Sequence, residues 1–389
     1  MTFTENLAEL YRDVLLEDVI PFWTNHSIDM RCGGYFTCLD RKGDVFDTDK
    51  FVWLQGRQAW MYSKLYNEVD QNGEWLDIAR LGAEFLRDHG MDDGGNFYFS
   101  LERSGKPLVQ PYNIFSDCFA AMAFSEYARA SGEDWAGELA VDTFRNIQKR
   151  AGNPKGQYSK AFPGTRPLVS LALPMITINL ALELRSQIDD PGLDEAIQAN
   201  MELVMGKLVD RDLGLIFENV SPDGSHPDTF DGRLVLPGHG IEAMWFIMDT
   251  ARAQGKEELI EPAARAMLKQ LEFGWDNEDG GIYYFMDSMG KPSEHLEWAQ
   301  KLWWVHLEAL VGTALAHELT GNELYLEWYQ KIHEYAWDRF PDPDYGEWWG
   351  YLDRHGKLLI PLKGGKWKGC FHVPRAMFEL WRIFERLGS

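Results

Sequence analysis

NEDGGIYYFMDSMGKP, residues Asn277 to Pro292, shows a pattern that recurs along the chain. Acidic residues lead into glycine, an aromatic run with strand character follows, and a second turn with glycine ends the segment. DDGGNFYFSLERSGKP, residues Asp92 to Pro107, has the same order of features. Strand residues between glycine-containing turns predict a short β-hairpin in each segment.

The pattern repeats with a period of about sixty residues, which is typical of a repeat architecture. Segments of this kind are centred on Gly34, Gly95, Gly214, Gly281 and Gly346. The interval between Gly95 and Gly214 is about twice as long as the others, and GNPKGQYSKAFPGTRP lies near its middle, around Gly156. We therefore predict a sixth hairpin there.

Two segments of helical length separate successive hairpins. NIFSDCFAAMAFSEYARASG and EDWAGELAVDTFRNIQKRAG, residues 113–132 and 133–152, both space apolar residues as a helix does. One helix of each pair is apolar nearly all round and should be inner, and its partner is amphipathic and should be outer. Six pairs predict an all-α (α/α)6 barrel with short β-hairpins at one end, forming a single domain over residues 1–389. An open solenoid is the structural alternative, because periodicity does not show closure.

Composition restricts the partners of the chain. The 389 residues carry a formal net charge of −23, which argues against nucleic acid and anionic membranes as partners. The amino-terminal residues do not resemble a signal peptide and no later run approaches a membrane span, so we expect a cytoplasmic protein. The four cysteines show no metal-type spacing and are expected to be reduced thiols.

Polar residues cluster where the predicted inner helices begin. Because the hairpins precede the inner helices, these first turns should share one end of the barrel. The helices are otherwise almost wholly apolar, so the polar groups are either paired in the core or directed into a common pocket. They are Arg57, Asn113, Asp117, His239, Glu242, Lys301, Glu308, His372 and Arg375.

His239 and His372 are the strongest candidates for chemistry. Each is followed three residues later by a charged residue, Glu242 or Arg375, on the same helical face, which can orient an imidazole. The glycines flanking His239 should let a ligand approach closely. A histidine that only caps a helix is the structural alternative. His306 is a rival candidate, although the face with Glu308 is favoured. No metal-binding motif such as HExxH occurs, and no metal is expected.

Several long motifs resemble the N-acylglucosamine 2-epimerases, whose mammalian members are also named renin-binding proteins. The resemblance covers essentially the whole chain. Its motifs are FDTDKFVWLQGRQAW, QPYNIFSDCFAAMAFSEYA, GRLVLPGHGIEAMWF, EWAQKLWWVHLEALV and GGKWKGCFHVPRAM. The resemblance implies interconversion of N-acetylglucosamine and N-acetylmannosamine by a homodimeric (α/α)6 barrel. It places the catalytic pair at His239 and His372, with Arg57, Glu308 and Arg375 beside them.

Related cellobiose 2-epimerases also use the glutamate that corresponds to Glu242. They carry a further histidine on an earlier inner helix, but PLVSLALPMITINLALEL contains none, which argues against activity on a disaccharide.

The chemistry of epimerisation suits these residues. Inverting carbon 2 of an open-chain aldose needs one base to remove the proton and an acid on the opposite face to return one. Histidine, with an ordinary pKa of about 6.5, serves both roles near neutral pH. Arg57 or Arg375 would stabilise the enolate, and no redox cofactor is needed. We expect the sugar to be bound by Asn113, Asp117, Lys301, Trp303 and Trp304.

Three other functions remain open from the sequence. An aldose–ketose isomerase of the mannose isomerase type would return the proton to carbon 1 instead of carbon 2. An inverting glycoside hydrolase would use Glu242 and Glu308 as acid and base. A non-enzymatic binding protein would show no turnover.

A basic segment interrupts the acidic chain between Asp142 and Glu183. Its glycines, hydroxyls and spaced cations suit a phosphate-bearing ligand, although a solvated loop is the alternative. Members of the resembled family often bind ATP as an activator that is not consumed, so we predict a nucleotide site at Lys155, Lys160 and Arg166. A second basic stretch, residues 354–375, predicts positive potential near the enolate or an anionic substrate.

Overall fold

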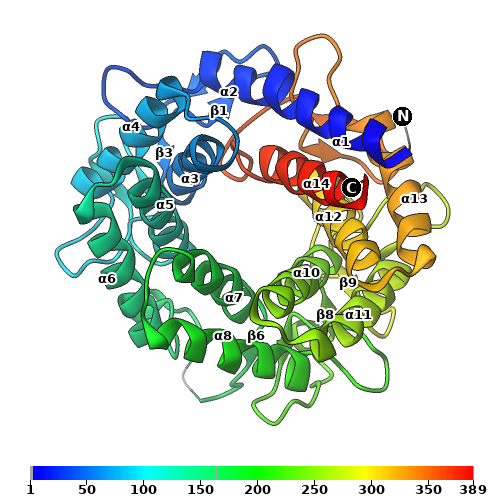
Figure 1. Ribbon diagram of the computed structural model, residues 1–389. Helices are drawn as coiled ribbons and strands as arrows, with labels where there is room; N and C mark the ends of the chain where they lie inside the picture. The colour runs from blue at the N-terminus through cyan, green and yellow to red at the C-terminus, as the bar shows by residue number, and fades with distance from the viewer. Residues whose placement is uncertain (1–2, 163, 389) are drawn as a thin grey trace.

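Two concentric rings of helices make up the computed structural model, which describes residues 3–162 and 164–388. Figure 1 looks along the common axis of the rings. The inner ring consists of α3 (Val52–Glu68), α5 (Phe115–Ser131), α7 (Ala172–Arg185), α10 (Pro237–Gln254), α12 (Trp303–Thr320) and α14 (His372–Gly388).

The outer ring alternates with the inner one along the chain. It consists of α1 (Phe3–Asp13) continuing through η1 (Val14–Val19) into α2 (Ile20–His26), α4 (Gly73–His89), α6 (Asp134–Arg150), α8 (Pro191–Leu203) with η3 (Val204–Leu208), α11 (Ile260–Gly274) and α13 (Glu323–Arg339). Three short helical segments lie between them: η2 (Gly156–Tyr158), α9 (Phe230–Arg233) and η4 (Glu257–Leu259). The predicted succession of paired helices is confirmed.

The apolar helices and the amphipathic helices differ in which of their residues are buried. Every residue of α12 from Trp303 to Ala316 is buried, because outer helices cover one side and the other inner helices the other. The outer helix α4 buries Ile78, Ala79, Gly82 and Ala83 on one face and keeps its charged residues toward solvent. The apolar and the amphipathic helix of each pair therefore take the inner and outer places.

The ring is closed by contacts between the two ends of the chain. Tyr11 of α1 stacks on Phe384 of α14, with ring centroids 6.1 Å apart. Trp60 of α3 meets Phe371, just before α14, with centroids 5.5 Å apart. The predicted (α/α)6 barrel is thus confirmed, and the open solenoid is not formed.

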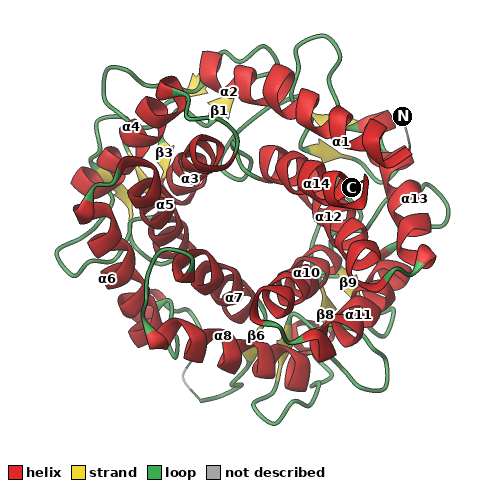
Figure 2. Ribbon diagram, in the orientation of Figure 1, coloured by secondary structure: helices red, strands yellow, loops and turns green. Residues whose placement is uncertain are grey.

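The strands are short, antiparallel and placed between the helices, as Figure 2 shows. They are β1 (Cys38–Leu39), β2 (Val45–Asp47), β3 (Lys50–Phe51), β4 (Ser100–Leu101), β5 (Pro107–Val109), β6 (Val169–Ser170), β7 (Asn219–Val220), β8 (Leu234–Val235), β9 (Met286–Asp287), β10 (Lys301–Leu302), β11 (Tyr351–Leu352) and β12 (Leu358–Ile360). Their sheets are β1-β2, β3-β4-β5, β6-β7, β8-β9 and β10-β11-β12. In the last sheet Lys301 lies opposite Leu352. Strands from successive repeats therefore pair with one another.

Five of the six predicted turns share one geometry. In each, a β-bridge encloses the turn, and the central glycine has φ between 66° and 76°, a conformation that side chains disfavour. The bridges are Ile28–Tyr35, Met91–Phe97, Val209–Ile216, Trp275–Ile282 and Pro341–Trp348. These turns confirm the predicted repeat.

The sixth predicted hairpin, around Gly156, is wrong. Residues Gly156–Tyr158 form a 3-10 turn, and the described part of 152–167 contains no strand. In the other turns an aspartate accepts a backbone N–H two residues later, as Asp276 does from Glu278 at 3.0 Å. No aspartate precedes Gly156 in the corresponding residues, so this turn lacks that support.

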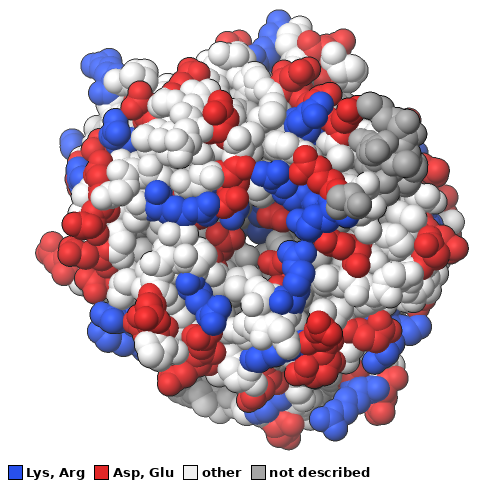
Figure 3. All heavy atoms as spheres, in the orientation of Figure 1, with Lys and Arg blue, Asp and Glu red and all other residues white. Residues whose placement is uncertain are grey.

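The inner helices begin at the end of the barrel where the strands lie, since β3, β8 and β10 lead directly into α3, α10 and α12. Figure 3, in the orientation of Figure 1, shows acidic and basic side chains interspersed over one face, with both kinds around a central hollow. No helix in the described part of the chain is long and apolar enough to cross a membrane. The four cysteines are unpaired.

Candidate active site

A cavity of about 440 Å³ opens at the barrel end where the inner helices begin. It is lined by Trp53, Arg57, Phe115, Phe119, Ala172, Met175, Ile176, His239, Glu242, Tyr284, Glu297, Gln300, Leu302, Trp303, Trp304, Tyr351, Trp367 and His372. Six predicted site residues are in this lining: Arg57, His239, Glu242, Trp303, Trp304 and His372. These six residues come from four inner helices, α3, α10, α12 and α14, and the lining as a whole comes from all six.

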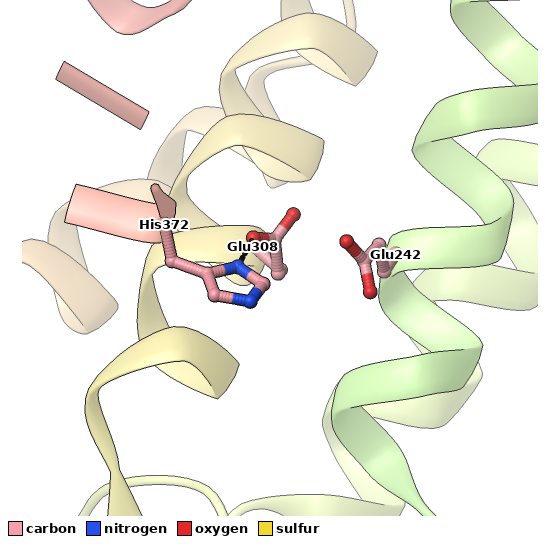
Figure 4. A group of neighbouring side chains, drawn as sticks. All are labelled: Glu242, Glu308 and His372. Atoms are coloured by element: carbon pink, nitrogen blue, oxygen red, sulfur yellow. Dashed lines mark hydrogen bonds and ion pairs between the residues drawn. The ribbon is translucent and has the colours of Figure 1, made fainter. Parts of the chain in front are cut away.

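His372 is held at the start of α14 by a carboxylate of α12. Its Nδ1–H donates to Oε1 of Glu308 at 2.7 Å, and the other ring nitrogen is directed away from Glu308 (Figure 4). Burial, followed by the positive charges of Arg57 and Arg375, holds the pKa of His372 well below its usual range. His372 is therefore neutral at neutral pH, with Nε2 free to accept a proton.

His239 is held at the start of α10 by a residue that the sequence analysis did not single out. Its Nδ1 lies 3.0 Å from Oε2 of Glu218, and 26% of the side chain is exposed. Burial favours the neutral imidazole, but Glu218, then Glu242 and Glu308, raise the pKa of His239 above its ordinary value. The two histidines are thus anchored alike, and their pKa values are shifted in opposite directions.

Trp304 lies close to both imidazoles. Its ring centroid is 5.4 Å from that of His239 and 5.7 Å from that of His372. A sugar resting on this indole would therefore lie near both imidazoles.

Arg375 joins the two glutamates behind the cavity. Its Nη2 donates to Glu242 at 2.7 Å and to Glu308 at 2.6 Å. Trp245 also donates through Nε1 to the second oxygen of Glu308, at 2.8 Å. Arg375 and Glu308 are therefore buried supports of the lining residues.

Glu242, Glu308 and His372 offer donor atoms within 4.8 Å of one another, close enough to hold a metal ion (Figure 4). Arg375 already supplies a positive charge to both carboxylates. A cation between them would have to compete with this buried guanidinium.

Arg57 is the guanidinium that lines the cavity. It packs over the rings of Trp53, Phe119 and Phe371, at 4.4, 4.0 and 4.5 Å from their centroids. Its Nε has no hydrogen-bond partner among the described residues, whereas Arg375 is committed to two carboxylates. Burial lowers the pKa of Arg57 to about 9, which leaves it charged at neutral pH. Of the two predicted arginines, Arg57 is the one free to meet a developing negative charge.

Three residues predicted to bind the sugar lie outside the cavity lining. Lys301 is fully buried with Nζ 3.0 Å from Asp276. Asp117 accepts from Arg150 of α6 at 2.6 Å, and the side chain of Asn113 accepts the N–H of Phe115. These contacts stabilise turns and helix starts. Lys301 and Asp117 are paired because an isolated charge in the core is unfavourable.

The other histidine candidate and the glycines around His239 serve packing. His306 receives the N–H of Ile282 at Nε2 and donates from Nδ1 to the carbonyl of Leu302. A Cβ on Gly238 would lie 2.6 Å from the ring of Trp304, and one on Gly240 2.6 Å from Gln270. These two glycines therefore allow Trp304 and Gln270 to pack closely against the start of α10.

The two basic segments differ in the structure. Lys155, Lys160 and Arg166 are exposed on the loop before α7 and do not line the cavity. In the second segment Lys363 is buried against Asp342, and Lys368 against Glu347. The positive charge predicted for that second segment is thus largely neutralised by buried carboxylates.

Comparisons with known proteins agree with this arrangement. Residues 34–376 match the family model of N-acylglucosamine 2-epimerase (GlcNAc 2-epimerase). The chain is 37% identical over 381 residues to the N-acylglucosamine 2-epimerase of Bos taurus, covering 96% of this chain and 90% of that protein.

Two solved structures share the fold. The cellobiose 2-epimerase from Bacillus thermoamylovorans B4167 has a TM-score of 0.84 at 21% identity, covering 98% of this chain and 100% of that one. A D-mannose isomerase has a TM-score of 0.83 at 16% identity, covering 96% and 97%.

A closed double ring of helices, with charged and imidazole side chains around one end of its axis, defines the class of (α/α)6-barrel proteins with a polar cavity at one end. Within that class the chain belongs to the N-acylglucosamine 2-epimerase family. It is a sugar 2-epimerase, and the resemblance noted in its motifs is confirmed.

Proposed function

We propose that the enzyme interconverts N-acetylglucosamine and N-acetylmannosamine by a two-histidine mechanism at carbon 2. The observation that carries this proposal is that His239 and His372 line one cavity and both pack near Trp304. Each imidazole is fixed through Nδ1 by a carboxylate, which leaves Nε2 for the sugar.

These groups can carry out each proton transfer that the reaction requires. In the open-chain aldose, Nε2 of one histidine takes the proton from carbon 2, and the C–H electron pair forms the double bond of an enolate. Arg57 stabilises the negative oxygen of that enolate. The second histidine then returns a proton to carbon 2 from the opposite face.

The choice of a monosaccharide rests on the relatives and on α7. The curated relatives at 37% identity are named for N-acylglucosamine. Helix α7 contributes only Ala172, Met175 and Ile176 to the cavity lining, all apolar. This part of the cavity offers no histidine like that of the cellobiose enzymes.

The test is incubation with N-acetylmannosamine in deuterated water, followed by NMR. The expected product is N-acetylglucosamine carrying deuterium at carbon 2. A ketose labelled at carbon 1 would instead identify an aldose–ketose isomerase, the alternative favoured by the fold shared with a D-mannose isomerase. Product without label at carbon 2 would contradict the proposal.

We further propose that ATP activates the enzyme without being consumed and binds at Lys155, Lys160 and Arg166. The support is the exposure of these three cations on one loop of an otherwise acidic chain. The family resemblance also supports a homodimer, which light scattering of the purified protein would test.

A further inference from the structure

We propose that Glu218 is a positioning residue that fixes His239 through Nδ1 and makes it the charged imidazole of the pair in the sugar-free enzyme, leaving His372 as the neutral base. The inference deepens the proposed epimerisation and rests on it for its catalytic meaning. The contact between Glu218 and His239 stands on geometry alone.

The backbone of Glu218 is fixed between two inner helices. Its N–H donates to Leu234 at 3.0 Å, just before α10, and its carbonyl accepts from Leu171 at 2.9 Å, at the start of α7. The side chain is 13% exposed and reaches His239 at 3.0 Å. The carboxylate is therefore held in place relative to the helix that carries His239.

The repeat shows that the fold itself does not need a charge at this position. Glu218 lies four residues after the turn glycine Gly214, as Phe99 follows Gly95 and Gly350 follows Gly346. The carbonyls of Phe99 and Gly350 likewise accept the N–H of the residue that begins an inner helix, at 3.0 and 3.1 Å. A phenylalanine and a glycine fill the same structural place, so the carboxylate of Glu218 is explained by its contact with His239.

The two anchoring carboxylates differ in their own partners. Glu308 shares its charge with Arg375 and receives Trp245, whereas Glu218 has no lysine or arginine partner in the described chain. An imidazolium at position 239 thus faces an uncompensated carboxylate. An imidazolium at position 372 would face a carboxylate already paired with a guanidinium.

Most of the other charges around the pair act in the same sense, although Glu242 also raises the pKa of His372. His239 faces Glu242 and Glu308 besides Glu218, and also the imidazole of His372. His372 faces Arg57 and Arg375 together with Glu242. The pKa of His239 is raised and that of His372 is lowered, in agreement with the assignment drawn from the contacts.

The assignment has a kinetic consequence. The sugar epimer that presents its carbon 2 proton to His372 reacts with the resting enzyme directly, since His372 is neutral and His239 holds the proton to be returned. The opposite epimer needs the two imidazoles to exchange charge states first. Activity should therefore fall at alkaline pH as His239 loses its proton, and at acid pH as His372 gains one.

The experiment is a titration of the sugar-free enzyme labelled with ¹⁵N-histidine, followed by NMR and assigned with His239→Asn and His372→Asn. In the wild type, His239 should titrate at higher pH than His372. In Glu218→Gln, the titration of His239 should move to lower pH by about 1–3 units, the usual effect of an adjacent charge. The alkaline limb of kcat/KM should move with it.

Two further variants separate positioning from general damage. Glu218→Asp keeps the charge on a shorter side chain, so kcat should fall while the alkaline limb stays higher than in Glu218→Gln. Glu297→Gln removes another carboxylate of the cavity lining and should leave the titration of His239 in place, whatever its effect on KM.

The outcomes are distinct from those that test the proposed function. An unchanged titration of His239 in Glu218→Gln, or a wild-type His372 that titrates above His239, would overturn the inference even if the enzyme epimerises N-acetylmannosamine. A wild type that places no deuterium at carbon 2 would overturn the proposed function, with the titrations still readable.

Discussion

Nδ1 of His372 lies 2.7 Å from Oε1 of Glu308, so a residue of α14 is oriented by a residue of the neighbouring inner helix α12. The same oxygen also accepts Nη2 of Arg375. Glu308 therefore sets the direction of the imidazole and neutralises a buried guanidinium. Its removal should affect catalysis although it does not line the cavity.

Glu308→Gln should lower kcat by about two to four orders of magnitude, because the amide orients His372 less well and leaves Arg375 without half of its charge compensation. Steady-state kinetics and circular dichroism would measure activity and folding. Glu318→Gln, in the same helix but bound to Arg386 at its far end, is the matched control and should remain active. Near-normal turnover of Glu308→Gln would show that His372 needs no anchor.

His239→Asn and His372→Asn should each lose epimerisation by about two to four orders of magnitude while remaining folded. Each variant retains one base, and so should exchange the carbon 2 proton of only one epimer with deuterated water. NMR of both epimers incubated separately would reveal this division. If either variant exchanged the protons of both epimers at similar rates, a single base would suffice and the two-base mechanism would be wrong.

Arg57→Met should lower kcat by about 10²–10³-fold, because the enolate oxygen loses a nearby positive charge. Arg57→Lys should recover only part of this loss, since an ammonium does not reproduce the planar packing over Trp53 and Phe119. Separate measurement of kcat and KM would show whether Arg57 acts in the chemical step or in binding of the sugar. A change confined to KM would assign Arg57 to binding of the sugar alone.

Lys301→Met should destabilise the fold by about 3–5 kcal/mol, because it leaves the buried Asp276 with the more distant and partly exposed Arg354, 3.9 Å away, in place of its buried partner. The pKa of Asp276 is lowered to about 2, below its ordinary value of 3.8. The stability it contributes is therefore complete above about pH 4 and is lost as the pH falls toward 2. Urea unfolding across this range should show a weaker acid dependence in the variant than in the wild type.

The control for that variant is Arg265→Met, which breaks an exposed ion pair with Glu261 and should cost at most about 1 kcal/mol. KM should stay close to the wild-type value in Lys301→Met, since Lys301 does not line the cavity. A large rise in KM would show that Lys301 contributes to binding of the sugar after all.

Replacing Lys160 and Arg166 together by alanine should weaken ATP binding and activation and leave basal epimerisation largely intact. Calorimetry should show a larger loss for ATP than for AMP, because more phosphate charge meets the same cations. Lys42→Ala with Lys106→Ala, exposed lysines of other turns, controls for lost charge. Unchanged ATP affinity in the loop variant would place the nucleotide elsewhere.

The sequence by itself determined the repeat and the place of the histidines. Turn glycines at regular intervals take positive φ in the structure, and alternating apolar and amphipathic segments become inner and outer helices. These features are local, because a turn or a helix face depends on residues close together in the chain. His239 and His372 consequently share one end of the barrel, as the order of turns and helices predicted.

Only the tertiary structure decided which charges meet. The sequence analysis paired His239 with Glu242 and His372 with Arg375, one helical turn away. Arg375 does lie near His372, with Nη2 3.4 Å from Nδ1. Closure of the ring adds a carboxylate 21 residues earlier to His239 and one 64 residues earlier to His372, at 3.0 and 2.7 Å. Contacts between helices depend on how whole faces pack, and no spacing within one segment encodes them. For the same reason Lys301 pairs with Asp276 outside the cavity lining, and Glu218 contacts His239.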